Sequence, residues 1–158
     1  MPEQRFSKTI PRPVTEVWAA ITAERQPWYF NSAFVGPRRA GEPFRYEKPD
    51  GSITYIDGIL TEFVPPRRMV QEFRFTDLED APTTVVWEVA EEDGHAVVTL
   101  LHDFPEITAT YKRTKGGWPR ILDSLEAILV RGKLPLLTRV QNALLGPVIR
   151  LSSLTKKS

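Results

Sequence analysis

The chain contains 158 residues with a formal net charge of +1, and 41% of its residues are hydrophobic and 26% are charged. This length and balance fit one globular domain with its own core, and they exclude a low-complexity or disordered chain. The absence of cysteine excludes a disulfide framework and a thiol nucleophile. Because no secretory signal or membrane-spanning apolar run is visible either, we expect a cytoplasmic protein.

The charge is divided unevenly along the chain. Acidic side chains outnumber basic ones over residues 1–126, whereas residues 127–158 hold six basic side chains and no acidic one. An acidic body repels phosphate, so we expect no nucleic-acid partner. Arg38 and Arg39 fall in a predicted loop, where solvated charge is the simplest interpretation.

Two elements are predicted at the start of the chain. Residues 3–10 alternate between apolar and polar side chains, which is typical of a strand. Residues 13–22 predict a helix, because their apolar side chains recur at three- and four-residue spacing. A second short helix or a turn is expected over residues 24–32, where Pro27 interrupts the pattern.

Five strands are predicted next, at residues 42–48, 52–64, 67–76, 82–91 and 95–103. The dipeptides Asp50-Gly51 and Asp93-Gly94 are typical of tight hairpin turns. A loop is expected at Pro65-Pro66, because proline cannot donate a hydrogen bond within a sheet. Consecutive hairpins predict an antiparallel meander.

A closing helix is predicted from Trp118 to Arg131. Pro119 suits the first helical turn, and Gly132 can end the helix. Its apolar stripe consists of Trp118, Ile121, Leu122, Leu125, Ile128 and Leu129. The order of elements therefore predicts an α+β domain with its helices on one face of the sheet.

Six short motifs in this order resemble the heat-shock-protein-90 ATPase activator-like family of the START / Bet v 1 / polyketide cyclase (SRPBCC) superfamily. The matching residues are Pro13, Val17 and Trp18; Trp28 and Tyr29; Gly41, Phe44 and Tyr46; Gly58, Glu62, Pro65 and Pro66; the strand pair ending at His102; and Gly117, Trp118, Leu122 and Leu125. The resemblance covers about residues 5–133.

The resemblance implies a helix-grip (Bet v 1-like) fold. In this fold a curved antiparallel β-sheet wraps around a long C-terminal helix, two short helices follow strand 1, and a cavity commonly remains between sheet and helix. We therefore expect a helix-grip ligand-binding domain over residues 1–133 and a basic amphipathic C-terminal extension over residues 134–158.

The resemblance implies binding of a hydrophobic or aromatic small molecule, a lipid included, in this cavity. Bulky aromatic side chains on the inner faces of strands fit a wall of that kind. The candidate ligand-binding residues are Trp28, Phe44, Tyr46, Tyr55, Phe73, Trp87, His102, Trp118 and Leu122. For each aromatic residue alone, a place in an ordinary core is the competing interpretation.

His102 has two interpretations. At the end of the last strand it is either a structural histidine bonded to its surroundings or the acid/base group of a cyclase- or isomerase-type enzyme. Only His95 and His102 are present, without a metal-binding pattern, so we expect no metal site and no cofactor. A third alternative is a chaperone cofactor or protein-interaction module that acts through its surface.

The extension, residues 134–158, has a partly amphipathic pattern that Pro147 interrupts. Three roles stay open for it: packing on its own domain, dimerisation, or peripheral contact with an anionic membrane.

Overall fold

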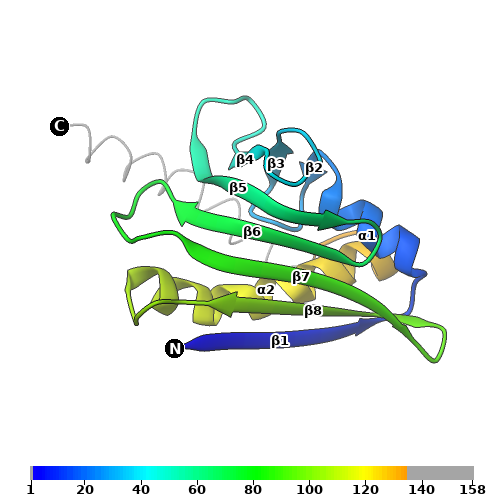
Figure 1. Ribbon diagram of the computed structural model, residues 1–158. Helices are drawn as coiled ribbons and strands as arrows, with labels where there is room; N and C mark the ends of the chain where they lie inside the picture. Colours follow the sequence, from blue (N-terminus) through cyan, green and yellow to red (C-terminus); the bar gives the residue numbers. More distant parts are fainter. Residues whose placement is uncertain (1, 135–158) are drawn as a thin grey trace.

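The computed structural model describes residues 2–134 and shows a curved antiparallel sheet with helix α2 lying across one face (Figure 1). In chain order the elements are β1 (Glu3–Ile10), α1 (Val14–Thr22), β2 (Arg25–Gln26), β3 (Ser32–Val35), β4 (Pro43–Glu47), β5 (Thr54–Val64), β6 (Arg68–Phe75), β7 (Thr83–Glu92), β8 (His95–Asp103) and α2 (Ala109–Arg131). The eight strands are ordered β1-β8-β7-β6-β5-β4-β3-β2. The predicted helix-grip fold is confirmed.

The strands follow the alternation of the sequence. In β7, Val85, Trp87 and Val89 are buried, whereas Thr84 is exposed and Glu88 is partly exposed. The turn into β8 has φ values of 51° at Asp93 and 79° at Gly94, as a type I′ hairpin requires. The predicted hairpin is therefore confirmed, and its register places His102 beside Val85.

Gly58 permits a close approach between β5 and β6. A Cβ atom at this position would lie 1.6 Å from the backbone oxygen of Glu72 and 3.0 Å from the Phe44 ring. Only glycine leaves room for both neighbours.

Helix α2 begins at Ala109, earlier than the predicted start at Trp118. Thr108 caps it, and its hydroxyl accepts a hydrogen bond from the N–H of Tyr111 at 3.5 Å. Pro119 consequently lies inside the helix, not in its first turn, so that prediction was wrong. The predicted end is confirmed, since Gly132 is left-handed and its N–H bonds to the oxygen of Ile128.

Of the two alternatives predicted for residues 24–32, the structure shows the turn, and the second short helix after β1 is absent from this part of the described chain. Strand β2, a turn and the start of β3 occupy this segment, so α1 is the one short helix after β1. Phe30 and Asn31 have φ values of 52° and 47°, which a right-handed helix cannot accommodate.

The expectation that Arg38 is simply solvated was wrong. Its guanidinium donates to the backbone oxygens of Thr22, Phe34 and Gly36 at 3.0, 2.8 and 2.7 Å. The same group lies 3.8 Å from the centre of the Phe34 ring. Arg38 therefore fastens the loop after β3 to the end of α1, whereas Arg39 is exposed.

The predicted C-terminal extension lies outside the described residues, apart from Leu134, which packs against the core. Within residues 2–134, neither helix is long and apolar enough to cross a membrane.

Candidate functional site

Trp118 lies at the centre of an aromatic cluster between α2 and the sheet. The centre of its ring is 5.9 Å from that of Tyr29, 6.0 Å from that of Phe73 and 5.9 Å from that of Trp87. Tyr29 in turn stacks on Tyr46 at 4.5 Å with the rings almost parallel. These bulky side chains fill much of the space that the curved sheet encloses.

The structure places every predicted site residue except Tyr55 in or against this cluster. Trp28, Phe44, Tyr46, Phe73, Trp87, His102, Trp118 and Leu122 are all buried. Tyr55 is partly exposed and lies at the edge of the core.

His102 is fully buried and bonded at both ring nitrogens. The indole N–H of Trp118 donates to Nδ1 at 3.0 Å, and Nε2 lies 2.6 Å from the hydroxyl of Thr83. Since an indole N–H can only donate, Nδ1 must be the acceptor and the proton must sit on Nε2. Burial lowers the pKa of His102 to about 3, which keeps the ring neutral. This arrangement fits the structural interpretation of His102.

A small pocket opens beside Trp118, between α2 and β6. It encloses about 20 Å³ and is lined by Tyr29, Phe30, Phe73, Phe75, Arg113, Thr114, Gly117, Trp118 and Ile121. Its walls are mostly apolar. The side chain of Arg113 lies at the pocket, and its guanidinium is 4.6 Å from the centre of the Phe75 ring. Space for a ligand is therefore limited unless side chains move.

A second hollow of about 590 Å³ lies over β4 and β5, where Pro43, Gly58 and Ile59 contribute to its lining. Two charged lining residues already have partners, since Asp57 pairs with Arg74 and Arg45 pairs with Glu47. We therefore place the candidate site at the pocket beside Trp118.

Three buried polar groups of the aromatic cluster have no hydrogen-bond partner among the described residues. They are the hydroxyl of Tyr29, the side-chain oxygen of Gln71 and the indole N–H of Trp87. All three side chains are at most 1% exposed. A buried polar group without a partner costs roughly 1–3 kcal/mol, so three in one cluster require an explanation.

Tyr29 and Gln71 are connected through Tyr46. The amide nitrogen of Gln71 donates to the Tyr46 hydroxyl at 2.9 Å, while the Tyr46 ring stacks on Tyr29. Burial raises the pKa of both tyrosine hydroxyls, so both remain protonated donors at neutral pH.

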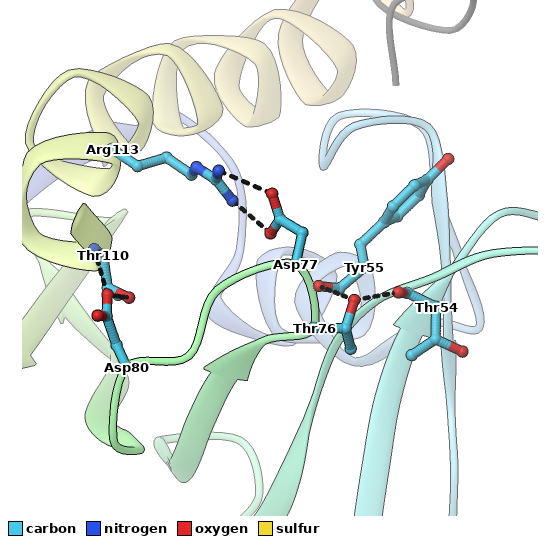
Figure 2. Close-up of polar contacts among 7 residues, drawn as sticks. All are labelled: Thr54, Tyr55, Thr76, Asp77, Asp80, Thr110 and Arg113. Atoms are coloured by element: carbon cyan, nitrogen blue, oxygen red, sulfur yellow. Dashed lines mark hydrogen bonds and ion pairs between the residues drawn. The ribbon is translucent and has the colours of Figure 1, made fainter. Parts of the chain in front are cut away.

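The loop between β6 and β7, residues 76–82, is fastened to the first turns of α2 next to the pocket (Figure 2). Arg113 donates to both carboxylate oxygens of Asp77 at 2.7 and 2.9 Å. Asp80 accepts from the backbone N–H of Thr110 at 2.8 Å and from its hydroxyl at 2.7 Å. These hydrogen bonds to Thr110 lower the pKa of Asp80.

The base of this loop is fastened to the sheet. The hydroxyl of Thr76 donates to the backbone oxygens of Thr54 and Tyr55 (Figure 2). The loop therefore connects the end of the sheet to the start of α2.

Sequence reasoning missed most of the pocket's lining. Phe75 lies on a predicted strand but was not selected as a site residue. Arg113 and Thr114 were not expected there, because residues 109–117 carried no clear helical signal. The aromatic pair Trp28-Tyr29 was a usable signal, but its second member was not selected. Within residues 2–134, no group of three or more histidine, aspartate or glutamate side chains gathers as a metal site would require.

Comparison with known families identifies the chain. Residues 11–130 match the family described as activator of Hsp90 ATPase homolog 1-like protein. The chain belongs to this family. No curated protein sequence matches this member of the Hsp90 activator homolog 1-like family.

Solved structures share the fold of this family member at low sequence identity. DynU16, a protein of the dynemicin biosynthetic locus, has a TM-score of 0.71 and 22% identity over 84% of this chain. The aligned region spans 48% of DynU16, about half of its length. CalU16 from Micromonospora echinospora has a TM-score of 0.69 and 20% identity, covering 87% of this chain and 80% of its own.

A third neighbour is PFC0360w, an HSP90 activator from Plasmodium falciparum. It has a TM-score of 0.67 and 22% identity, covering 80% of this chain and 95% of its own. Likeness at this level of identity concerns the fold, so the function must be argued from the site.

Proposed function

We propose that the protein binds a small apolar or aromatic molecule between α2 and the sheet, in contact with Trp118. The observation that carries this proposal is the apolar pocket beside Trp118, which is lined by the buried Tyr29 with its unpartnered hydroxyl. Trp28, Phe44, Tyr46, Trp87 and Leu122 would support its inner wall. A pocket with apolar walls and a few polar groups is the usual form of a small-molecule site.

The pocket must widen to admit such a molecule. Its volume of about 20 Å³ is close to that of one water molecule. Phe30 is 39% exposed, so it can move with little loss of packing. Arg113, whose side chain is 42% exposed, can move aside only if its hydrogen bonds to Asp77 break. Binding would then be driven by burial of apolar surface, at ~25 cal/mol per Å².

The first experiment is native mass spectrometry of freshly purified protein, followed by organic extraction. A bound molecule of one defined mass is the expected result, and its identification would give the chemical class. Loss of that mass on extraction, with the fold retained by circular dichroism, would support a reversible site. A protein mass without any ligand across several preparations would count against the proposal.

Two neighbouring glycines of α2 allow a matched test of where the ligand binds. Gly117 lines the pocket and Gly116 does not, and neither has another atom within 4 Å of an added Cβ. Gly117→Leu should fill the pocket and abolish ligand retention, whereas Gly116→Leu should retain the ligand. Equal retention by the two variants would place the ligand elsewhere.

A protein-interaction role is the second candidate. The aromatic side chains that fill the interior favour it, and the neighbour PFC0360w is an HSP90 activator. A pull-down with the full chain should then recover a stoichiometric partner that Gly117→Leu leaves unaffected. Membrane contact or dimerisation through residues 134–158 remains a prediction from the sequence.

A cyclase or isomerase mechanism through His102 has less support. Both of its nitrogens are engaged, and its low pKa leaves it a weak base at neutral pH. Any turnover of a candidate substrate should therefore survive His102→Asn, if the variant folds.

A further inference from the structure

The unpartnered polar groups of the aromatic cluster point to the chemistry of the ligand. We propose that it is an aromatic molecule carrying a hydroxyl or carbonyl group, which hydrogen-bonds to Tyr29, Gln71 and Trp87. This inference rests on the proposed function, since it concerns the same site.

Two of the three groups, the Tyr29 hydroxyl and the Trp87 indole N–H, belong to rings that flank Trp118. The rings of Tyr29 and Trp87 each lie 5.9 Å from the Trp118 ring, centre to centre. Gln71 lies two residues from Phe73 on β6, and Phe73 lines the pocket beside Trp118. Of the three side chains, Tyr29 lines the pocket as it stands, whereas Gln71 and Trp87 do not. A flat ligand that enters beside Trp118 would therefore meet Tyr29 first, and further side chains must move before it reaches Trp87 and Gln71.

Their hydrogen-bonding capacity defines what they would recognise. The indole N–H of Trp87 can only donate, the side-chain oxygen of Gln71 can only accept, and the Tyr29 hydroxyl can do either. A carbonyl oxygen would satisfy the donors, whereas a hydroxyl would satisfy a donor and the Gln71 oxygen together. A pure hydrocarbon would leave all three groups unpaired in an apolar interior.

Gln71 is held in a fixed orientation that suits this role. Its amide nitrogen already donates to the Tyr46 hydroxyl at 2.9 Å, so its oxygen is the end that remains available. Because the two groups share one side chain, the Tyr46 bond would also fix the acceptor in place before the ligand arrives.

The test uses two probes of nearly equal shape, 2-naphthol and 2-methylnaphthalene, titrated into the full chain by calorimetry. We expect 2-naphthol to bind at least tenfold more tightly, because a site built to hydrogen-bond a hydroxyl rejects the analogue without it. Tyr29→Phe and Gln71→Leu should each reduce this preference while leaving 2-methylnaphthalene binding unchanged. The Trp87 indole N–H resonance should shift with 2-naphthol.

The melting temperature of the ligand-free protein provides a second, independent test of the unpartnered Tyr29 hydroxyl. Tyr29→Phe removes a hydroxyl without a partner and should leave the melting temperature unchanged or higher. Tyr46→Phe is the matched control and should lower it, since that hydroxyl accepts a bond from Gln71. An equal loss in both variants would show that the Tyr29 hydroxyl is structural, and would overturn the inference.

The outcomes separate this inference from the proposed function. Equal or tighter binding of 2-methylnaphthalene overturns the inference and leaves small-molecule binding intact. An extracted natural ligand without a hydroxyl or carbonyl group does the same. If neither probe binds and nothing is extracted, the proposed function fails and this inference fails with it.

Discussion

The indole N–H of Trp118, on α2, donates to Nδ1 of His102, on β8, across 3.0 Å. This bond fixes the histidine as its neutral Nε2–H form, which can then donate to the hydroxyl of Thr83 on β7. One buried imidazole thereby connects the long helix to two neighbouring strands.

This arrangement predicts that the protein loses stability in mild acid. Burial lowers the pKa of His102 from 6.5 to about 3. Between these two values the imidazole is protonated in the unfolded state and neutral in the folded state. The free energy of unfolding should then fall by about 1.4 kcal/mol per pH unit from pH 6.5 towards pH 3. Denaturant titrations at pH 7.0, 6.0 and 5.0 measure this change in the free energy of unfolding directly.

Two histidine variants check the origin of this effect. His102→Asn should be less stable at pH 7, since it leaves Thr83 without its ring partner, but its stability should change little between pH 6.5 and 5. The control His95→Asn alters an exposed side chain and should keep the wild-type dependence. An unchanged acid response in His102→Asn would assign the effect to another group.

Gly116 and Gly117 lie inside α2, yet neither has a positive φ or a neighbour within 4 Å of an added Cβ. Alanine should therefore stabilise the protein by about 1 kcal/mol at each position, through helix propensity. Gly58→Ala is the opposite case and should be severely destabilising, because its Cβ would meet the Glu72 backbone. Thermal unfolding of the three variants tests this, and a loss of stability in the helix variants would contradict it.

The loop of residues 76–82 should hold down the start of α2. Asp77→Ala together with Asp80→Ala removes both carboxylate contacts, so amide hydrogen exchange over residues 109–114 should accelerate. Because hydrogen bonding to Thr110 lowers the pKa of Asp80, its contact is complete above about pH 4 and weakens as the pH falls further.

Asp57→Ala is a suitable control for this loop. It removes a comparable exposed carboxylate, paired with Arg74 on the sheet, and should leave exchange in α2 unchanged. Equal acceleration in both would mean that general loosening, and not the loop, is responsible.

Arg38→Lys should destabilise the protein by roughly 1–3 kcal/mol, because lysine cannot reach the three carbonyl oxygens that the planar guanidinium binds. Arg39→Lys changes the adjacent, exposed arginine and should have little effect. Chemical denaturation compares the two, and similar stabilities would show that the Arg38 contacts contribute nothing.

The longer strands and the β7–β8 hairpin could be predicted from the sequence because their signals are local, whereas the short strands β2 and β3 were not predicted. Alternation gave the inner face of β7, and the dipeptide Asp93-Gly94 located its turn. The motifs shared with the family similarly placed Gly58, whose need for close backbone approach the structure explains.

The start of α2 could not be predicted, because part of its stabilisation comes from elsewhere in the chain. Its first turns contain Gly116 and Gly117 and lack a strong apolar pattern. Asp80, 30 residues before Thr110, binds the N–H of that residue, and Gln4 on β1 bonds to Tyr111 and Thr114. Contacts between residues so far apart in the chain produce no periodic pattern in the sequence.

The sequence by itself determined the α+β order, the hairpins, the apolar faces and most of the aromatic residues that meet in the interior. Only the tertiary structure decided that His102 is enclosed by Trp118 and Thr83, and that Tyr29, Gln71 and Trp87 keep unpartnered polar groups. The reason is physical: burial depends on local residue type and spacing, whereas hydrogen-bond partnership depends on which distant side chains the curved sheet brings within 3 Å of one another.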